Sequence, residues 1–297
     1  MKGGVSFKTY LLAFLAIVLW GMSYIWNDRL IGLGIPMEYF VFVRSVIGGA
    51  VLLVFNLVTG ADLRIRRADI PKFALLAFCE PFVNFLAETH GIALTESPSY
   101  SAMITATAPL ISIAAGLLFF GERLSALNYF GFGLTVGGIM LSTFTASEVG
   151  PMFVLGVVLL VIGAASDVGL ASCTKMVASS YRPSVIVMYQ FLIGAVFFAP
   201  LFATVGLKDY DPVLYMSFDV WEPVLCLALL CTCVSFSLWA MTIKDLGVAR
   251  SCVLLSMIPV VTAVAGEILG SEHLGMMQWA GIVVACVGIV LSQLQKK

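Results

Sequence analysis

The chain has little charge and no surplus of positive charge. Only 11% of its 297 residues are Asp, Glu, Lys or Arg, and the formal net charge is −1. Proteins that bind nucleic acid usually present a basic surface, so this balance argues against nucleic acid as a partner. Hydrophobic residues make up 61% of the chain and the mean hydropathy is +1.05. A soluble domain of this length is not so apolar, and the composition indicates a multi-pass membrane protein.

The sequence also lacks the motifs of catalytic and cofactor sites. It contains no phosphate-binding glycine loop, no cluster of metal-ligating residues and no nucleophile elbow, and its two histidines stand apart. The seven cysteines show no paired-ligand spacing, so we interpret them as small buried residues. We therefore expect no metal, no cofactor and no catalytic residue. Any movement of a solute against its gradient must then draw on an ion gradient or on exchange.

Ten apolar runs are long enough to cross roughly 30 Å of hydrocarbon, which takes about 20 helical residues. They cover residues 9–26, 37–58, 71–90, 98–119, 125–144, 152–173, 184–205, 221–242, 248–269 and 275–294. The runs are continuous and rich in Leu, Ala, Gly and Phe, whereas a membrane β-barrel has alternating strands of about 10 residues. The predicted fold is an all-α integral membrane protein with ten transmembrane helices.

The chain contains an internal duplication. Residues 101–142 reappear at 251–292 with a constant offset of 150. The matched pairs include Pro109 and Pro259, Glu122 and Glu272, Gly131 and Gly281, and Gly138 and Gly288. The match continues weakly at an offset of 146, which sets Arg44 against Gln190, so a five-helix repeat at 1–145 corresponds to one at 146–297. Because each repeat has an odd number of spans, the two must lie upside down to one another, an architecture typical of transporters.

Lys and Arg are distributed unevenly between the predicted loops. If the N-terminus lies in the cytoplasm, the outer loops hold two of these residues, Arg29 and Lys208. The inner segments then hold thirteen, namely Lys2, Lys8, Arg64, Arg66, Arg67, Lys72, Arg123, Lys175, Arg182, Lys244, Arg250, Lys296 and Lys297. We therefore expect both termini to be cytoplasmic. The short termini and the absence of sorting signals favour a bacterial inner membrane.

Several motifs carry a family resemblance. These are Leu19-Trp20-Gly21-Met22-Ser23-Tyr24, Pro36 with Arg44, Ala108-Pro109, Gly121-Glu122-Arg123-Leu124, Gly131 and Gly138-Ile139, with Pro259, Glu272, Leu274, Gly281 and Gly288 in the second half. Together they resemble the EamA-type branch of the drug/metabolite transporter superfamily, over essentially the whole chain. The resemblance implies ten helices in two inverted repeats around a central substrate cavity that works by alternating access. Members export amino acids and other small metabolites or drugs, or carry sugar phosphates or nucleotide sugars, so the substrate does not follow from membership.

Ionisable groups at bilayer depth are costly unless they are paired, solvated or neutralised, so each is a functional candidate. Arg44 keeps its proton at working pH and must meet a carboxylate, water or an anionic substrate group. We consider two alternatives for it, a structural ion pair with a neighbouring helix and the anchoring of a substrate carboxylate.

The run at 71–90 is the most polar span. Glu80, Asn84 and Glu88 follow at spacings of four, which at about 100° per residue places them within one arc of a helix. A buried carboxyl at the depth of Glu80 can hold a proton and exchange it for substrate, so Glu80 is the candidate for proton coupling. Glu88 and His90 are expected near the outer end of the span, where interfacial solvation explains them.

The remaining candidates are weaker. Asp167 and Lys175 are expected to line an inner vestibule, although a structural hydrogen bond would also explain Asp167. The aromatic residues expected to wall a cavity are Trp20, Tyr24, Tyr100, Tyr189 and Trp239, and Gln190 joins the substrate-binding candidates as the counterpart of Arg44. Pro109 and Pro259 each remove a backbone hydrogen bond, so kinks there could shape or gate the cavity. Gly133 and Gly137 predict close packing of the helix at 125–144, and dimerisation through this face is an alternative use of the pair. Glu122 and Glu272 are assigned to turns between helices. Glu267 replaces Leu117 of the first repeat, which hints at function, although its position at a helix end also explains it.

These observations favour a secondary active transporter that exports a small polar metabolite such as an amino acid. Arg44 would bind substrate charge, Glu80 would couple protons, and Asn84 with aromatic neighbours would orient the substrate. Its expected partners are the substrate, the lipid bilayer and coupling protons, and it is expected to be a monomer or homodimer. An efflux carrier for cationic amines or drugs is an alternative, because carboxylates outnumber Arg44. A membrane-embedded lipid-modifying enzyme with Glu80, Glu88 and His90 as acid–base groups is the alternative from another class, but the duplication gives no reason for chemistry on one helix only.

Overall fold

In the computed structural model, the described residues are 7–108, 110–111, 126–143, 150–208, 210–246, 251 and 254–293. Helices account for nearly all of this part, and it contains no strand. The α-helices are α1 (Phe7–Gly32), α2 (Met37–Val58), α3 (Ile70–Ala77), α4 (Asn84–Thr95), α5 (Pro98–Thr105), α7 (Ala126–Thr143), α8 (Pro151–Val177), α9 (Pro183–Leu201), α10 (Pro212–Tyr215), α11 (Phe218–Leu225), α12 (Phe236–Leu246), α14 (Ile258–Leu269) and α15 (Met276–Gln293). A 3₁₀ turn, η1 (Arg67–Asp69), and three π-helical segments, η2 (Phe78–Val83), η3 (Phe202–Gly206) and η4 (Cys226–Ser235), join some of them.

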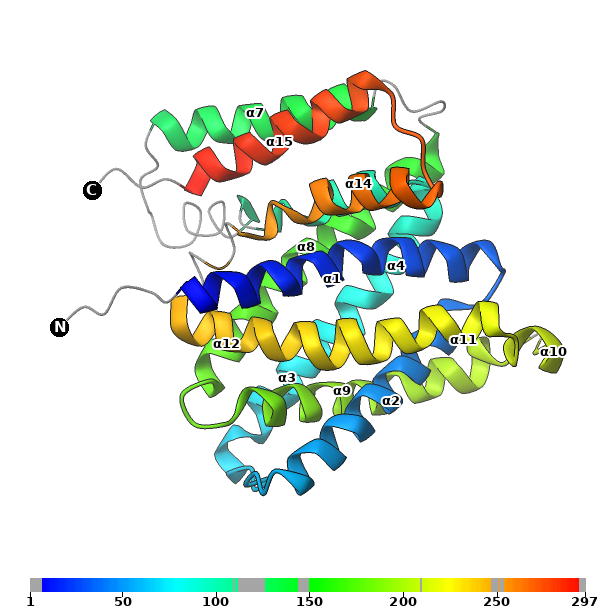
Figure 1. Ribbon diagram of the computed structural model, residues 1–297, viewed down its shortest axis with the longest axis vertical. Helices are drawn as coiled ribbons and strands as arrows, with labels where there is room; N and C mark the ends of the chain where they lie inside the picture. Colours follow the sequence, from blue (N-terminus) through cyan, green and yellow to red (C-terminus); the bar gives the residue numbers. More distant parts are fainter. Residues whose placement is uncertain are drawn as a thin grey trace.

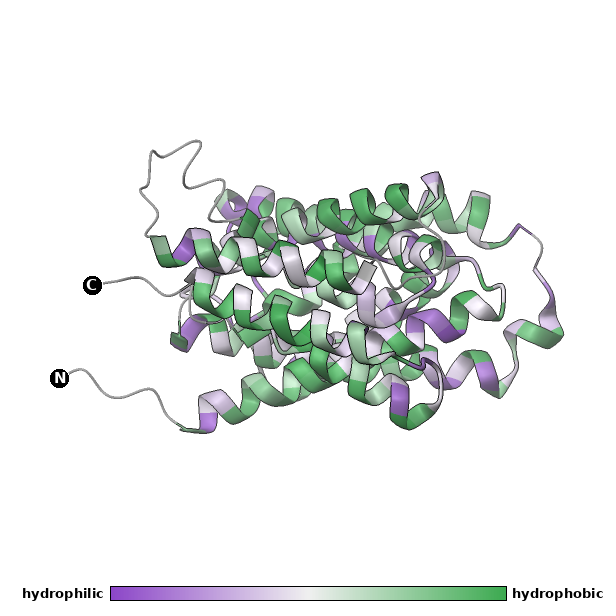
Figure 2. Ribbon diagram, turned by 90° about the horizontal axis from the view of Figure 1, so that it is seen from above, coloured by the Kyte–Doolittle hydropathy of each residue, from purple (hydrophilic) through white to green (hydrophobic). Residues whose placement is uncertain are grey.

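Nine of the ten predicted spans coincide with apolar helical stretches among the described residues. Six of these stretches are long enough to cross a membrane, at Phe7–Gly32, Met37–Val58, Arg67–Thr95, Pro151–Val177, Pro183–Gly206 and Phe218–Leu246. Three shorter ones are Ala126–Ser142, Ile258–Leu269 and Met276–Ser292. The tenth span, predicted at 98–119, is described as α5 and a few residues after it. Hydrophobic residues cover the middle of the bundle and hydrophilic residues gather toward its two ends, which confirms the all-α membrane fold (Figure 2).

The start of α1 and the end of α15 lie at the same end of the bundle, which we call the terminal end (Figure 1). Helix α1 runs away from this terminal end, and α8, its counterpart in the second half, runs back toward it (Figure 1). Contacts at the terminal end agree, because the Tyr181 hydroxyl in the loop after α8 donates to Asp69 Oδ2 at 2.8 Å, in the loop after α2. The two halves are therefore inverted. The repeat boundary predicted at 145/146 lies outside the described residues and stays a prediction.

The packing of helices repeats when the two halves are exchanged. Helix α7 packs along α15, α2 along α9 and α5 against α14, so each of these helices meets its own counterpart. Helix α4 packs against α8, and the equivalent segment η4–α12 packs against α1. Likewise α1 packs against α14, and α8 packs against α5. This exchange symmetry is what two inverted five-helix repeats require.

The duplicated glycines lie where α7 and α15 touch. A Cβ atom on Gly138 would lie 2.5 Å from the backbone nitrogen of Ala285, and one on Gly288 would lie 2.4 Å from that of Thr135. Only glycine allows the two backbones to approach so closely. The prediction that Gly133 and Gly137 provide the packing face was wrong, because neither has an atom of another element within 4 Å of its Cβ position.

Proline interrupts several spans, and π-helical turns accompany the interruptions. Pro200 and Pro223 lie in the last turns of α9 and α11, just before η3 and η4, and Pro81 lies inside η2. A proline lacks the N–H of the regular ladder, so the backbone around it widens or breaks. At Glu80 the backbone is extended, with φ −147° and ψ 124°. The third span is therefore not one continuous helix. The rotation of about 100° per residue, from which Glu80 was predicted to share a helix face with Asn84 and Glu88, does not apply across Glu80.

Equivalent turns interrupt the fourth and ninth spans. The Thr107 N–H donates to Ile104 O at 3.0 Å, and the Met257 N–H donates to Leu254 O at 3.1 Å, 150 residues later. Pro259 follows in the first turn of α14, so it restarts a helix and does not bend a continuous one. Pro109 lies outside the described residues, as do Glu122 and Arg123.

Candidate functional site

A cavity of about 90 Å³ lies between the two halves. Its walls come from α1, α2, η2, α4 and α5 of the first half and from α8 and α12 of the second. The two equivalent turns also reach it, through Ala106 and Ala108 on one side and Leu255 and Ile258 on the other. Interrupted helices thus meet at a shared cavity, as in transporters whose broken helices form the substrate site.

Arg44 is the cationic group of this cavity. Its side chain is 3% exposed, and the guanidinium carbon lies 4.1 Å from the centre of the Phe85 ring. Nε and Nη2 each reach Thr232 Oγ1 at 3.4 Å, which is long for a hydrogen bond. None of the ion pairs among the described residues includes Arg44. The structural ion pair considered for it is therefore not formed, and its charge stands toward the cavity over an aromatic face.

Glu88 faces Arg44's cavity and binds Tyr24. The Tyr24 hydroxyl donates to Glu88 Oε2 at 3.0 Å. Both side chains are buried and line the cavity. The prediction that Glu88 lies at a solvated helix end was wrong, because the helix places it inside the bundle, whereas His90 is exposed and lies 3.7 Å from Glu38.

Asn84 and Asp167 join the third span to α8. Asn84 Nδ2 donates to Asp167 Oδ1 at 2.7 Å and to the carbonyl of Gly163 at 3.1 Å. The structural hydrogen bond considered for Asp167 is therefore present, and Asp167 also lines the cavity. Glu80 lines the same cavity as Asp167 and Glu88. Its Oε2 atom is buried and has no hydrogen-bond partner within the described part of the chain.

Aromatic rings form another part of the wall. Trp20 meets Phe236 with ring centres 5.0 Å apart and Trp239 at 5.3 Å, both edge to face. Phe85 lies 6.3 Å from Phe236. Trp20, Tyr24 and Trp239 thus lie in the cavity wall as predicted. Phe85 and Phe236 also lie there, although the sequence did not single them out.

Three predicted binding residues lie elsewhere. Tyr100 packs against Phe153 in a separate apolar cluster. Tyr189 donates its hydroxyl to Leu63 O at 2.8 Å, near the terminal end. Gln190 is buried without lining the cavity, and Lys175 is exposed. These placements remove Tyr100, Tyr189 and Gln190 from the cavity wall, and the expectation that Lys175 lines an inner vestibule stays a prediction.

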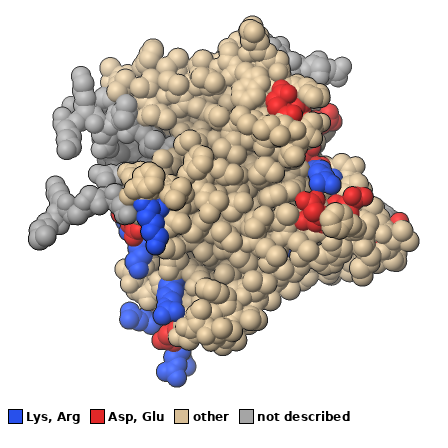
Figure 3. Space-filling model, in the orientation of Figure 1, with Lys and Arg blue, Asp and Glu red and all other residues tan. Residues whose placement is uncertain are grey.

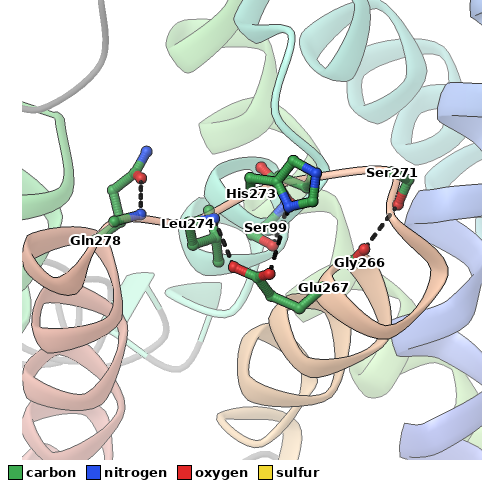
Figure 4. Close-up of polar contacts among 9 residues, drawn as sticks. Ser99, Gly266, Glu267, Ser271, His273, Leu274 and Gln278 are labelled. Atoms are coloured by element: carbon green, nitrogen blue, oxygen red, sulfur yellow. Dashed lines mark hydrogen bonds and ion pairs between the residues drawn. The ribbon is translucent and has the colours of Figure 1, made fainter.

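The glutamates at the end of α14 have local partners. Glu267 Oε1 accepts from the Leu274 N–H at 2.6 Å, and His273 lies 3.6 Å from Oε2, so this carboxylate closes the turn between α14 and α15 (Figure 4). Glu272 accepts hydrogen bonds from the Ser97 hydroxyl and from the N–H and hydroxyl of Ser99, at the start of α5. The assignment of Glu267 and Glu272 to helix ends and turns is confirmed.

The cavity therefore contains three carboxyl groups, those of Glu80, Glu88 and Asp167, against one guanidinium. Three buried carboxylates repel one another strongly in a region of low dielectric. The cluster as a whole is therefore suited to take up positive charge, either as protons or as a cationic group of a ligand. Arg44 remains available for an anionic group in the same space.

The comparison with known families decides what kind of protein holds this cavity. The profile of the EamA-like transporter family matches residues 7–144 and, a second time, residues 154–294. The chain belongs to the EamA-like transporter family. This membership makes it a membrane transporter of the drug/metabolite transporter superfamily, and the cavity lies between the two EamA-like halves.

The chain is also similar to a curated protein and to a solved structure. A protein of Acidianus ambivalens described as "Uncharacterized transporter in sor 3'region" is 28% identical over 261 residues, which cover 87% of this chain and 94% of that protein. A solved structure described as "Crystal structure of protein" has a TM-score of 0.71 with 17% identity and covers 96% of both chains. At that identity the similarity to the solved structure concerns the fold alone.

Proposed function

We propose that this EamA family member is a secondary active transporter that exports a small polar metabolite, with an amino acid as the best-supported class. The observation that carries the proposal is the cavity's combination of Arg44, which has no carboxylate partner, with Glu80, Glu88 and Asp167. An amino acid offers a carboxylate to the guanidinium and an ammonium to the carboxyl groups. Charge-assisted hydrogen bonds of this kind are worth about 1.5–3 kcal/mol each.

The size of the cavity favours a small substrate. Its volume of about 90 Å³ is well below the roughly 300–1,000 Å³ of sites that enclose drug-sized ligands. A multidrug carrier would need a much larger space in this conformation. A compact metabolite needs only a modest opening of the same walls.

Alternating access would come from relative rocking of the two inverted halves. The interruptions at Glu80, at Thr107 and at Met257 lie beside the cavity, where a change of backbone angle redirects a half-span. Pro259 belongs to this set as a residue that fixes where α14 begins. The matching gating role for Pro109 rests on the duplication in the sequence.

Glu80 is the proposed proton-coupling group. It lines the cavity, it is buried, and one of its oxygens has no hydrogen-bond partner in the described part of the structure. A carboxyl in this position can lose its proton when a cationic substrate group arrives and regain it when the substrate leaves. No nucleotide-binding motif offers another energy source in the sequence.

Efflux of a cationic amine is the second candidate. Two observations favour it, namely the excess of carboxyl groups over Arg44 and the aromatic wall of Trp20, Phe236 and Trp239. Aromatic faces attract organic cations. The two candidates differ in one respect, because only the amino acid uses Arg44.

The lipid-modifying enzyme receives less support. Its proposed acid–base set needs His90 beside Glu80 and Glu88, but His90 is exposed and lies against Glu38. The cavity also holds three carboxyl groups without an arranged nucleophile. We propose a noncatalytic carrier, as a monomer or homodimer.

The membrane side is proposed from charge. On the face drawn in Figure 3, Lys and Arg gather at the terminal end of the bundle, where α1 begins and α15 ends, and Asp and Glu dominate the opposite end. Positive residues favour the cytoplasmic side. We place both termini in the cytoplasm, at a bacterial inner membrane.

Uptake into proteoliposomes tests the proposal. A mixture of amino acids, amines and sugar phosphates is offered with and without an imposed pH gradient, and the vesicle contents are analysed by mass spectrometry. We expect gradient-dependent accumulation of one amino acid or a few, lost in Arg44→Gln and uncoupled from the gradient in Glu80→Gln. Arg29→Gln and Glu222→Gln, which alter an ion pair remote from the cavity, serve as matched controls. Transport that persists in Arg44→Gln and stays dependent on the gradient in Glu80→Gln would refute this mechanism, and no transport of any compound would refute the proposed function.

A further inference from the structure

A second hollow lies on the outside of the bundle toward the terminal end. It has a volume of about 590 Å³ and is walled by the last turns of α2, the first turn of α9 and the segment η4–α12. Its walls are mainly apolar, with Val51, Phe55, Val234 and Met241 among them, and these four side chains are 38–53% exposed. We call this hollow the α2–α12 groove. It is separate from the central cavity, and the transport proposal does not use it.

The groove arises from the way α2 crosses its neighbours. At Gly48 a Cβ atom would lie 2.6 Å from Thr232 Cγ2, and Cys233 Sγ lies 3.3 Å from Gly48 O, so α2 and η4 touch closely there. Beyond this crossing the residues of α2 from Val51 onward line the groove on one side, while α12 lines it on the other. Helix α9 packs against both α2 and α12. The groove is thus a wedge that opens from a tight crossing toward the terminal end.

Two cations stand at the open end of the groove. Arg182 immediately precedes α9 and Lys244 lies in the last turn of α12, and both are exposed and line the groove. Neither takes part in an ion pair within the described residues. The acidic member of the wall, Asp245, accepts a hydrogen bond from Thr9 Oγ1 at 3.2 Å. The groove therefore pairs a long apolar wall with two available positive charges at the level where Lys and Arg gather (Figure 3).

One polar atom inside the groove is unsatisfied. The Ser237 hydroxyl lines the wall, its oxygen is buried, and it has no hydrogen-bond partner in the described part of the chain. Seven residues separate it from Lys244, which corresponds to roughly 10 Å along a helix. A ligand with a charged head and oxygen atoms deeper along its length would bond at both levels.

We infer that the α2–α12 groove is a binding site for an anionic phospholipid. The acyl chain lies along Val51, Phe55, Val234 and Met241, and the phosphate group lies between Arg182 and Lys244. Each basic residue near a membrane surface raises the affinity for anionic lipid about fivefold. Basic hollows between helices at the membrane surface bind acidic lipid head groups by the same attraction. A lipid bound in the groove contacts both α2 and α12, which belong to different halves, and so favours one relative position of the two helices.

Native mass spectrometry of delipidated protein in detergent tests this site. The protein is titrated with phosphatidylglycerol and with phosphatidylcholine of identical acyl chains. We expect tighter binding of phosphatidylglycerol, and a loss of about 25-fold in this preference in the double variant R182A/K244A, from two contributions of about fivefold. The control R64A/K175A removes the same charge from exposed residues of the same end outside the groove and should keep the preference. Equal losses in the two double variants would overturn the site, because the attraction would then be general.

A second variant tests the apolar wall. Val234→Trp fills the groove and should lower the binding of both lipids at least fivefold, while thermal unfolding without added lipid shows whether the variant is folded. Unchanged lipid binding in folded Val234→Trp would place the lipid elsewhere and overturn the proposal. A shift from dimer to monomer in this variant, with lipid binding retained, would assign the groove to a second copy of the chain and also overturn it.

Discussion

The crossing of α7 and α15 allows a sharp test of the inverted repeat. We predict that Gly138→Ala destabilises the protein relative to Gly133→Ala, although both changes add one methyl group to the same helix. At Gly138 the new Cβ would lie 2.5 Å from Ala285 N and 2.6 Å from Gly281 O. At Gly133 it would meet no atom of another element within 4 Å. The neighbours at Gly138 are backbone atoms, so the helices must separate to admit the methyl group.

The size of the effect follows from this comparison. Replacing glycine by alanine in a helix gains about 0.8–1 kcal/mol from backbone propensity at either position. Overpacking costs about 1–3 kcal/mol, and this cost applies at Gly138 alone. The two variants should therefore differ by about 1–3 kcal/mol, or roughly 2–12 °C in unfolding temperature. Gly288→Ala, the symmetric position, should behave as Gly138→Ala does.

The assay is thermal unfolding of the purified protein in one detergent, followed by tryptophan fluorescence. Lower unfolding temperatures for Gly138→Ala and Gly288→Ala than for Gly133→Ala are expected. Equal unfolding temperatures for all three variants would refute the backbone contact between α7 and α15, and with it the reason for these duplicated glycines.

Further predictions concern the cavity and the turns. Tyr24→Phe and Glu88→Gln should each raise the substrate KM, and the double variant should cost less than the sum, because the two side chains share one hydrogen bond; additive effects in transport kinetics would contradict this. Asn84→Asp places a second carboxyl group beside Asp167, so the transport rate should fall at least tenfold at pH 8 and recover toward pH 5 as the pair takes up a proton. A ratio of variant to wild-type transport rate that stays constant between pH 8 and pH 5 would contradict this prediction. Glu272→Gln weakens a charged cap on α5 and should lower the free energy of unfolding by about 1 kcal/mol in chemical denaturation, with no change indicating that the cap contributes little.

The fold could be predicted because its causes are local. The lengths of the apolar runs set the lengths of the spans. The duplication, which matches Gly131 with Gly281 and Gly138 with Gly288, predicted the inversion, because two repeats with an odd number of spans each must lie upside down to one another. Because these four glycines match one another in the repeat, they indicate the face on which α7 and α15 pack. Gly133 has no glycine at its matching position, and a Cβ atom on it would meet no atom of another element within 4 Å. The π-helical segments were not predicted, because their exact extent depends on how neighbouring helices pack around Pro200 and Pro223.

The cavity was only partly predictable. Arg44, Glu80 and Asn84 lie in it as expected, since buried charge has few other solutions. The burial of Glu88 in the cavity was not predicted, because its position near the end of the span was taken to mean that solvent reaches it. The spacing from Asn84, which places the two side chains one turn apart on one face, was the better signal.

The aromatic predictions failed for a different reason. Tyr100 and Tyr189 lie within predicted spans, but a sequence does not say toward which neighbour a ring turns. Gln190 was chosen because it matches Arg44 in the repeat. The two positions are not occupied by the same kind of side chain, and only Arg44 reaches the cavity.

The most direct test of the substrate site compares an amino acid with the amine that lacks its carboxylate. Counterflow of each compound is measured in proteoliposomes that contain wild-type protein or Arg44→Gln. We predict that wild type prefers the amino acid by about 10- to 100-fold, the equivalent of one charge-assisted hydrogen bond to Arg44, and that Arg44→Gln loses this preference. Equal transport of the two compounds by wild type, or an unchanged preference in Arg44→Gln, would contradict the claim that Arg44 binds the substrate carboxylate.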